Sequence, residues 1–382
     1  MKKRKKSFQR LFGSFLISLI LGWGLIFIGL PSLAQAQEEF KYGAIMPVTG
    51  PIPQYGEYFI RGSQVALEDL EKTGWIGGKK IRVILEDGKA DPKISLAAMN
   101  KLVNIDKVPI VETLVTPVVM SIGPVAQQNK VVLVNTAAQS LAIRKLGDFI
   151  FSLNPLADQV MDVTVKYAAE GIKAKTVAII HVNNDYGRSV AATFKDLFEK
   201  KGGKINATEI INMGETDFTT HLTKIKFVKS DLIFMVAHEA ELGYALKKAK
   251  QIGLKTPFLC TPGMVAPMTF EIAGDAIEGV KSAYYVFHNE GTEKMKSFSK
   301  KYKDKFGVLP SVYSAYSYDS MMLYAAALKA GAKTGPQIKD FFYSLKDYEG
   351  VSGPITFDKD GINMAPPVIR EVKGGKFVDV KW

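Results

Sequence analysis

Residues 176–189 read TVAIIHVNNDYGRS and contain the change of pattern that decides the fold. The apolar run over 176–182 predicts a buried strand, and apolar residues recur with helical spacing over 190–198. Between them, residues 183–187 are polar apart from a tyrosine ring and a glycine. Polar side chains where a buried strand ends indicate a functional loop, because rigid elements hold binding residues in such loops.

The same alternation runs along the chain. Candidate strands lie at 42–48, 79–88, 109–115, 130–134, 175–180 and 232–237, and helical patterns at 60–70, 91–105, 190–198, 239–253, 293–307 and 318–331. The chain closes with hairpin-like segments at 353–361 and 367–380. Strands alternating with helices predict parallel sheets covered on both faces, and two consecutive sets predict two α/β domains.

Helix starts are predicted at three loops. Asp91 before Pro92 has the pattern of an N-cap followed by the first helical residue. Thr116 is predicted to cap a helix that Pro117 opens, and Thr136 is predicted to be the N-cap after the next strand.

Residues 1–36 are predicted to be a secretory signal peptide. A basic start precedes a continuously apolar run, and Ala34 and Ala36 then form an A-x-A site. We expect cleavage after Ala36 and a periplasmic location. An uncleaved anchor is the alternative, because about 20 apolar residues can span a membrane. Cys260 is the only cysteine in the sequence. A lipid anchor at the cleavage site and a disulfide framework would both need other cysteines, so both are excluded.

Charge and motifs exclude several classes of function. The leader contributes six of the lysines and arginines and no acid, so +6 of the net +12 remains on the mature chain. Those lysines share helices with acids and form no basic stripe, which argues against nucleic-acid binding. Four histidines lie without metal spacing, and no catalytic motif is present. We therefore expect that the protein is not an enzyme and binds no cofactor.

The polar clusters of the chain share one kind of position. Val115–Thr116, Thr136–Ala138, Tyr186 and His238–Glu239 all follow a predicted strand and precede a helical pattern. In an open parallel sheet this is the carboxyl edge, where ligands bind. Helix N-termini at that edge suit an anion such as a carboxylate.

Five blocks in order then give a resemblance to a known family. They are TGPIPQYGEYFIRGSQVALEDLEKTGWIGGKKIRVILEDGKADP, NDYGRSVAATFK, TDFTTHLTKIK, AGDAIEGV and YEGVSGPITFDKDG. The chain resembles the periplasmic solute-binding proteins of branched-chain amino acid ABC transporters, of the leucine/isoleucine/valine-binding type. The resemblance implies a type I periplasmic-binding-protein fold, in which two Rossmann-like lobes joined by three crossovers close on a ligand by a hinge motion. It implies lobe 1 at 37–155 and 287–348, and lobe 2 at 156–286 and 349–382.

The resemblance also implies the site. Hydroxyl-bearing residues and backbone N–H groups of lobe 1 hold the carboxylate, acids hold the ammonium, and aromatic rings cover the rest. The positions that match, or that occupy a matching place, are Tyr55, Val115, Thr116, Thr136, Ala137, Ala138, Leu156, Tyr186, His238, Glu239 and Pro262. Tyr313 is a further candidate.

Two of these positions depart from the family pattern. Leu156 and Pro262 stand where the ammonium-binding acids are expected. A buried ammonium without a counter-charge costs several kcal/mol, more than the contacts of a small apolar side chain return. The departures favour a carboxylate that lacks an amino group, aliphatic or aromatic. An amino acid held by a displaced acid (Asp158, Asp185 or Glu239) remains the alternative.

The resemblance implies partners as well. A monomer is expected to deliver its small-molecule ligand to an ABC-transporter permease in the inner membrane. A secreted sensor that reports to a membrane receptor would have the same fold and remains open.

Overall fold

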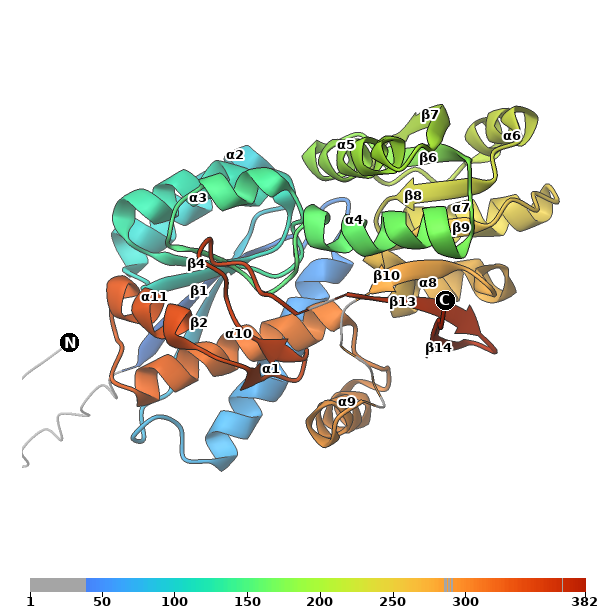
Figure 1. Ribbon diagram of the computed structural model, residues 1–382. Helices are drawn as coiled ribbons and strands as arrows, with labels where there is room; N and C mark the ends of the chain where they lie inside the picture. Colours follow the sequence, from blue (N-terminus) through green and yellow to red (C-terminus); the bar gives the residue numbers. More distant parts are fainter. Residues whose placement is uncertain (1–38, 285–286, 288, 290, 366) are drawn as a thin grey trace, which may run out of the picture. The chain divides into compact units, whose positions relative to one another are not determined.

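The computed structural model describes residues 39–284, 287, 289, 291–365 and 367–382, so the predicted signal peptide and its cleavage site lie outside the described residues. Within these ranges no helix combines the length and the apolarity needed to cross a bilayer. The described chain forms two sheets, each with its own helices (Figure 1).

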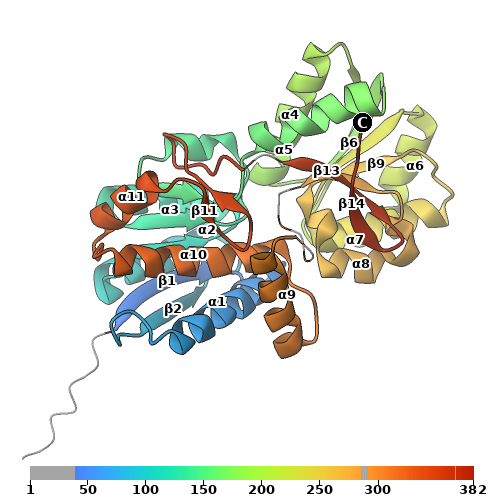
Figure 2. The same cartoon turned by 60° about the horizontal axis from the view of Figure 1, so that its bottom comes forward.

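The first sheet is fully parallel, with strand order β2-β1-β3-β4-β5. Its strands are β1 Phe40–Met46, β2 Ile81–Asp87, β3 Ile110–Thr113, β4 Val132–Asn135 and β5 Ile150–Ser152. Its helices are α1 Gln54–Lys72, α2 Pro92–Lys101, α3 Thr116–Asn129, α9 Glu293–Phe306, α10 Val312–Lys329 and α11 Gly335–Ser344. Figures 1 and 2 show α2 and α3 on one face and α1, α10 and α11 on the other. We call this half lobe 1.

The second sheet has strand order β14-β13-β10-β9-β8-β6-β7, parallel from β7 to β10 and antiparallel beyond. Its strands are β6 Thr176–Val182, β7 Lys204–Ile211, β8 Leu232–Val236, β9 Phe258–Cys260, β10 Lys281–Tyr284, β13 Val368–Lys373 and β14 Lys376–Asp379. Its helices are α4 Ala157–Lys166, α5 Asp185–Lys200, α6 Thr219–Val228, α7 Glu239–Gln251 and α8 Pro267–Ala273. We call this half lobe 2. The α/β class with two lobes is confirmed.

The strand at 176–182 and its loop show why the pattern is decisive. All of β6 after Thr176 is buried, as expected for a strand covered on both faces. The Asn184 side chain accepts a hydrogen bond from the Gly187 N–H and caps α5. A Cβ at Gly187 would lie 1.9 Å from the Val182 carbonyl oxygen, so only glycine lets α5 start this close to the strand.

The chain crosses between the lobes after β5, after β10 and between β12 (Pro354–Ile355) and β13. β12 pairs with β11 (Tyr348–Glu349) in a separate two-stranded sheet. The predicted third boundary, at 348/349, is too early. The Val351 N–H donates to Asp319 of α10, and Ser152 of β5 exchanges hydrogen bonds with Gly361 and Asn363. These bonds hold residues 351–363 on lobe 1.

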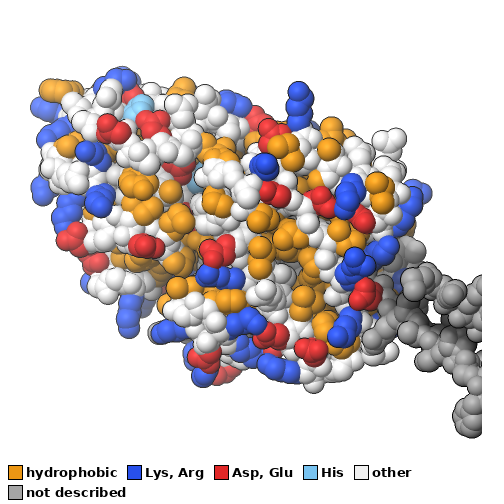
Figure 3. Space-filling model, turned by 180° about the vertical axis from the view of Figure 1, so that it is seen from behind, with side chains coloured by type: hydrophobic (Ala, Val, Ile, Leu, Met, Phe, Trp, Pro, Cys, Tyr) orange, Lys and Arg blue, Asp and Glu red, His pale blue; other side chains and the backbone are white. Residues whose placement is uncertain are grey.

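Charged side chains of both signs are spread over one face of the molecule, between hydrophobic side chains (Figure 3). On the face in Figure 3, lysines and arginines are interspersed with aspartates and glutamates. Many are paired along one helix, such as Lys195 with Glu199 and Lys200 with Asp196 on α5. Such pairs are typical of solvated helix faces.

Candidate functional site

A pocket lies where strands of both lobes end. It encloses about 410 Å³ of space between protein atoms, part of it open to solvent. Its walls come from the loops after β1, β3, β4, β8 and β9 and from α1, α3, α5 and α10. The lining residues are Ile52, Tyr55, Leu114, Val115, Thr116, Ala137, Ala138, Gln139, Tyr186, Ala237, His238, Gly263 and Tyr313. We call it the interlobe pocket.

Seven of the eleven predicted site residues line this pocket. They are Tyr55, Val115, Thr116, Ala137, Ala138, Tyr186 and His238. Four predicted residues, Thr136, Leu156, Glu239 and Pro262, are buried but are not among the lining residues. The further candidate Tyr313 lines the pocket.

The lobe 1 wall is the N-terminus of α3. Val115, not Thr116, is the N-cap residue, so the predicted cap is displaced by one position. Valine has no side-chain oxygen, and no side-chain hydrogen bond caps this helix. Thr116 is 1% exposed, and its Oγ1 has no hydrogen-bond partner among the described residues. A hydroxyl and an uncapped, positively polarised helix end therefore meet at the pocket.

The loop after β4 differs from the expected carboxylate cradle. No α-helix follows Thr136, so its predicted capping role is wrong. The Asn135 side chain accepts hydrogen bonds from the N–H groups of Ala137 (3.2 Å) and Ala138 (2.7 Å). Those two N–H groups are therefore already engaged, and the alanines present methyl groups to the pocket. The Thr136 hydroxyl lies 3.4 Å from the Thr113 carbonyl oxygen, outside the lining.

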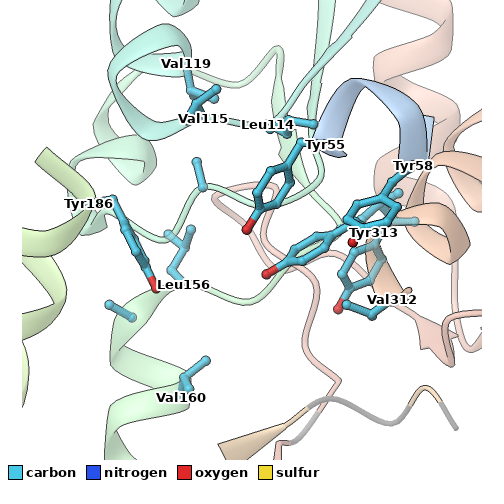
Figure 4. Close-up of a cluster of buried hydrophobic side chains, with 14 of the residues drawn as sticks. Tyr55, Tyr58, Leu114, Val115, Val119, Leu156, Val160, Tyr186, Val312 and Tyr313 are labelled. Atoms are coloured by element: carbon cyan, nitrogen blue, oxygen red, sulfur yellow. The ribbon is translucent and has the colours of Figure 1, made fainter. Parts of the chain in front are cut away.

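Aromatic rings from both lobes face one another across the pocket. Tyr55 of α1 lies 4.9 Å from Tyr313 of α10, measured between ring centroids. His238 of lobe 2 lies 5.9 Å from Tyr55, edge to face, and 5.5 Å from Tyr186. Figure 4 shows Tyr55 and Tyr313 close together and Leu156 beside Tyr186. These contacts give the pocket a largely apolar, aromatic body.

No aspartate, glutamate, lysine or arginine of the described chain is among the lining residues. Leu156 is fully buried as the N-cap residue of α4, and Pro262 begins the short 3₁₀ helix Pro262–Val265. Asp158 pairs with Arg144 at 3.1 Å, and Asp185 pairs with Arg188 at 2.6 Å. Both carboxylates are about half exposed, so neither replaces the missing acids from inside the pocket.

Glu239 is a buried acid beside the lining residue Gly263. Its Cγ would lie 3.6 Å from a Cβ placed on Gly263, which lines the pocket. The Tyr58 hydroxyl of lobe 1 donates to Glu239 Oε2 at 2.6 Å, whereas Oε1 has no partner among the described residues. Burial raises the pKa of this carboxyl to about 8, so Glu239 is mainly neutral at pH 7.

Sequence reasoning missed five lining residues: Ile52, Leu114, Gln139, Ala237 and Gly263. Four of them are chain neighbours of predicted positions, such as Ala237 beside His238. Ile52 lies in the TGPIPQYG block that was used for the resemblance. Extending each predicted position by one residue along its loop would have found four of the five.

Comparisons with known proteins agree with this geometry. The family described as "Periplasmic binding protein" matches residues 39–376. The leucine-, isoleucine-, valine-, threonine- and alanine-binding protein of Pseudomonas aeruginosa is 27% identical over 365 residues, which are 94% of each chain.

Two solved structures are similar to lobes 1 and 2 together. The branched-chain amino acid transporter substrate binding protein LivJ of Streptococcus pneumoniae, in complex with isoleucine, is 26% identical, with a TM-score of 0.81 over 90% of this chain and 100% of that one. A solute binding protein of an ABC transporter from Rhodopseudomonas palustris, in complex with 3,4-dihydroxybenzoic acid, is also 26% identical, with a TM-score of 0.81 over 90% and 96%. The chain is a type I periplasmic binding protein and belongs to the branched-chain amino acid ABC-transporter family.

Proposed function

We propose that this protein captures a small, largely apolar carboxylate that lacks an α-ammonium group, and delivers it to an ABC-transporter permease. One observation carries the ligand class. The pocket has an unpaired hydroxyl at an uncapped helix N-terminus, but no acid among its described lining residues. It offers a place for a negative charge, and no carboxylate among these lining residues is available to hold a positive one.

In this proposal the carboxylate of the ligand binds at the N-terminus of α3. The Thr116 hydroxyl can donate to one of its oxygens, and the first turn of the helix supplies a positive dipole end. The aromatic rings and the methyl groups of Ala137 and Ala138 then cover the apolar body of the ligand. Burying that body removes apolar surface from water, which stabilises the complex by roughly 25 cal/mol per Å².

The relatives bind ligands of both kinds. One solved neighbour holds isoleucine and another holds 3,4-dihydroxybenzoic acid. Because the two neighbours match this chain equally well in fold and identity, the fold does not select between the ligands. The side chains of the pocket decide, and they favour the carboxylate without an amine.

An amino acid is the second candidate, and Glu239 is the observation that favours it. Its Oε1 is buried and unpaired beside Gly263. A ligand ammonium at that oxygen would require Glu239 to ionise, against the burial that raises its pKa to about 8. This candidate therefore carries an electrostatic cost that the first does not.

Delivery is proposed to follow closure of the lobes. Contacts between Tyr58 and Glu239 and between Tyr55 and His238 join lobe 1 to lobe 2 beside the pocket. A ligand that touches both lobes favours the closed form, which then docks on the permease. Membership in a family of periplasmic binding proteins indicates that delivery occurs at the periplasmic face of the inner membrane. We propose that the protein acts as a monomer. A sensor role would use the same closure.

A thermal-shift panel tests the ligand class. The panel contains benzoate, pentanoate, 4-methyl-2-oxopentanoate, leucine and valine, each added to the purified protein. A ligand at 100 times its Kd stabilises the folded state by about 2.7 kcal/mol. We expect a clear increase in Tm with at least one amine-free acid. An increase with leucine or valine, and none with the amine-free acids, would contradict the proposal.

A further inference from the structure

His238 has a buried polar atom that the carboxylate site leaves unused. The residue is 7% exposed and lines the interlobe pocket. Its Nε2 has no hydrogen-bond partner among the described residues. A buried donor or acceptor without a partner destabilises the fold, so such atoms in proteins are usually paired. The ring atom is therefore available to a ligand in the pocket.

The ring is held in place by its surroundings. His238 is the N-cap residue of α7, two positions after β8 ends, which fixes its backbone at the sheet edge. Tyr186 lies against the ring at a tilt of 31°, and Tyr55 meets it edge to face at 81°. A ring packed between two tyrosines keeps its free nitrogen in a defined direction, which specificity requires.

The imidazole is uncharged. Burial lowers its pKa, and the neighbouring Glu241 carboxylate opposes that effect without reversing it. A neutral imidazole offers either an N–H donor or a lone-pair acceptor at Nε2, depending on the tautomer. It can therefore bond a hydroxyl or a carbonyl group, whereas it supplies no positive charge for a second carboxylate. The buried Glu241 on the first turn of α7 makes a second anion still less favourable.

We propose that His238 determines specificity by a hydrogen bond from its Nε2 to an uncharged oxygen on the ligand. The inference rests on the proposed carboxylate site. Thr116 and α3 belong to lobe 1 and His238 belongs to lobe 2, so the ligand is a carboxylic acid with a hydroxyl or keto oxygen distant from its carboxyl group. Such a ligand gives a hydrogen-bond partner to Thr116 Oγ1 and another to His238 Nε2. Because it touches both lobes, it favours closure.

Matched ligand pairs test this inference by isothermal titration calorimetry. Benzoate is compared with 3- and 4-hydroxybenzoate, and pentanoate with 4-oxopentanoate. Benzene-1,4-dicarboxylate serves as the charged comparison. We expect at least one oxygenated acid to bind about tenfold or more tightly than its parent, a difference of about 1.4 kcal/mol. The dicarboxylate is expected to bind more weakly than 4-hydroxybenzoate.

Substitution then assigns the preference to the residue. His238→Phe is expected to reduce the preference to below about twofold, since phenylalanine keeps the ring packing but has no polar ring atom. His238→Asn retains a polar atom and is expected to keep part of the preference. His221→Gln is the control, because both ring nitrogens of His221 contact Glu209 and Glu215 outside the pocket.

A measurement on the wild-type protein keeps the proposal testable if a His238 variant fails to fold. With ¹⁵N-labelled histidine, the Nε2 resonance of His238 should move when the preferred oxygenated acid is added, and move much less with its parent. Parents that bind while no oxygenated acid gains affinity would overturn this inference alone. A preference that survives His238→Phe would also overturn it. If leucine binds and none of these acids does, the proposed function fails as well.

Discussion

At the scale of single residues, Glu239 links the pocket to pH. Burial raises the pKa of its carboxyl from the ordinary 4.5 to about 8, so the folded protein holds a proton that the unfolded chain releases above about pH 4.5. The stability that this proton contributes is complete below pH 4.5. It is lost as the pH rises through 8.

Glu239→Gln tests this linkage. Glutamine stays neutral and keeps an oxygen for the Tyr58 hydroxyl, so the variant should lose this part of the pH dependence. We expect its Tm to exceed that of the wild type by on the order of 5 °C at pH 8, with the difference falling toward zero at pH 5. Thermal melts of both proteins at pH 5, 6, 7 and 8 measure it. Subtracting the wild-type melts cancels the effects of Glu112 and Asp319, whose pKa values burial also raises.

The same variant separates the two ligand candidates. Binding of an amine-free carboxylate should change by less than about threefold, because Glu239 takes no part in it. Binding of an amino acid through Glu239 would be abolished, because an ammonium needs the ionised carboxylate. If the Tm of the wild type and that of the variant change in parallel across this pH range, Glu239 is ionised in the folded protein.

At the scale of elements, two loops that looked alike in sequence differ in their hydrogen bonding. The N-terminus of α3 keeps the Thr116 hydroxyl unpaired, whereas the loop after β4 is closed on itself by the Asn135 side chain. Thr116→Val should therefore weaken carboxylate binding about tenfold or more, through the lost charge-assisted hydrogen bond, with little change in Tm. Thr136→Val is the matched control and should leave the Kd within about twofold. Calorimetry measures both, and equal losses in the two variants would contradict the assignment.

The same contrast separates features that can be predicted from the sequence from features that cannot. The strand at 176–182 and the helix start at Asp91 and Pro92 follow from local patterns, and the structure contains both. The loop after β4 does not follow, because the bonds of the Asn135 amide depend on chain geometry that residue types do not reveal.

Positions along the family pattern predicted seven lining residues, but not which neighbours turn inward. Leu156 and Pro262 show the same limit from the other side. Leu156 and Pro262, the positions predicted for the family acids, are both buried and lie outside the pocket lining.

At the scale of the whole molecule, the two lobes meet in contacts that opening would break. Three crossings join the lobes, and the last runs from lobe 1 near Asn363 into β13. Beside the pocket, the buried hydrogen bond from Tyr58 to Glu239 connects α1 to α7. Tyr58 is not a lining residue, and its ring packs against Tyr55 and Tyr313, so removing only its hydroxyl tests the contact between the lobes.

Tyr58→Phe tests whether this contact favours closure. The variant loses one hydrogen bond between the lobes, which contributes about 0.5–1.5 kcal/mol. If that energy favours the closed form, the apparent Kd should rise by about two- to tenfold for every ligand alike, because affinity scales with the closed fraction. Small-angle scattering of the ligand-free variant should give a larger radius of gyration than the wild type.

Tyr318→Phe is the matched control for this test. Tyr318 is as buried as Tyr58, at 7% exposure each, and its hydroxyl bond to Asp69, at 2.9 Å, joins α10 to α1 within lobe 1. Because the bond does not connect the lobes, its loss should lower Tm without changing the Kd or the scattering. An equal loss of affinity in both variants would mean that Tyr58 acts through general stability. An unchanged Kd in Tyr58→Phe would mean that this hydrogen bond has no part in closing the lobes.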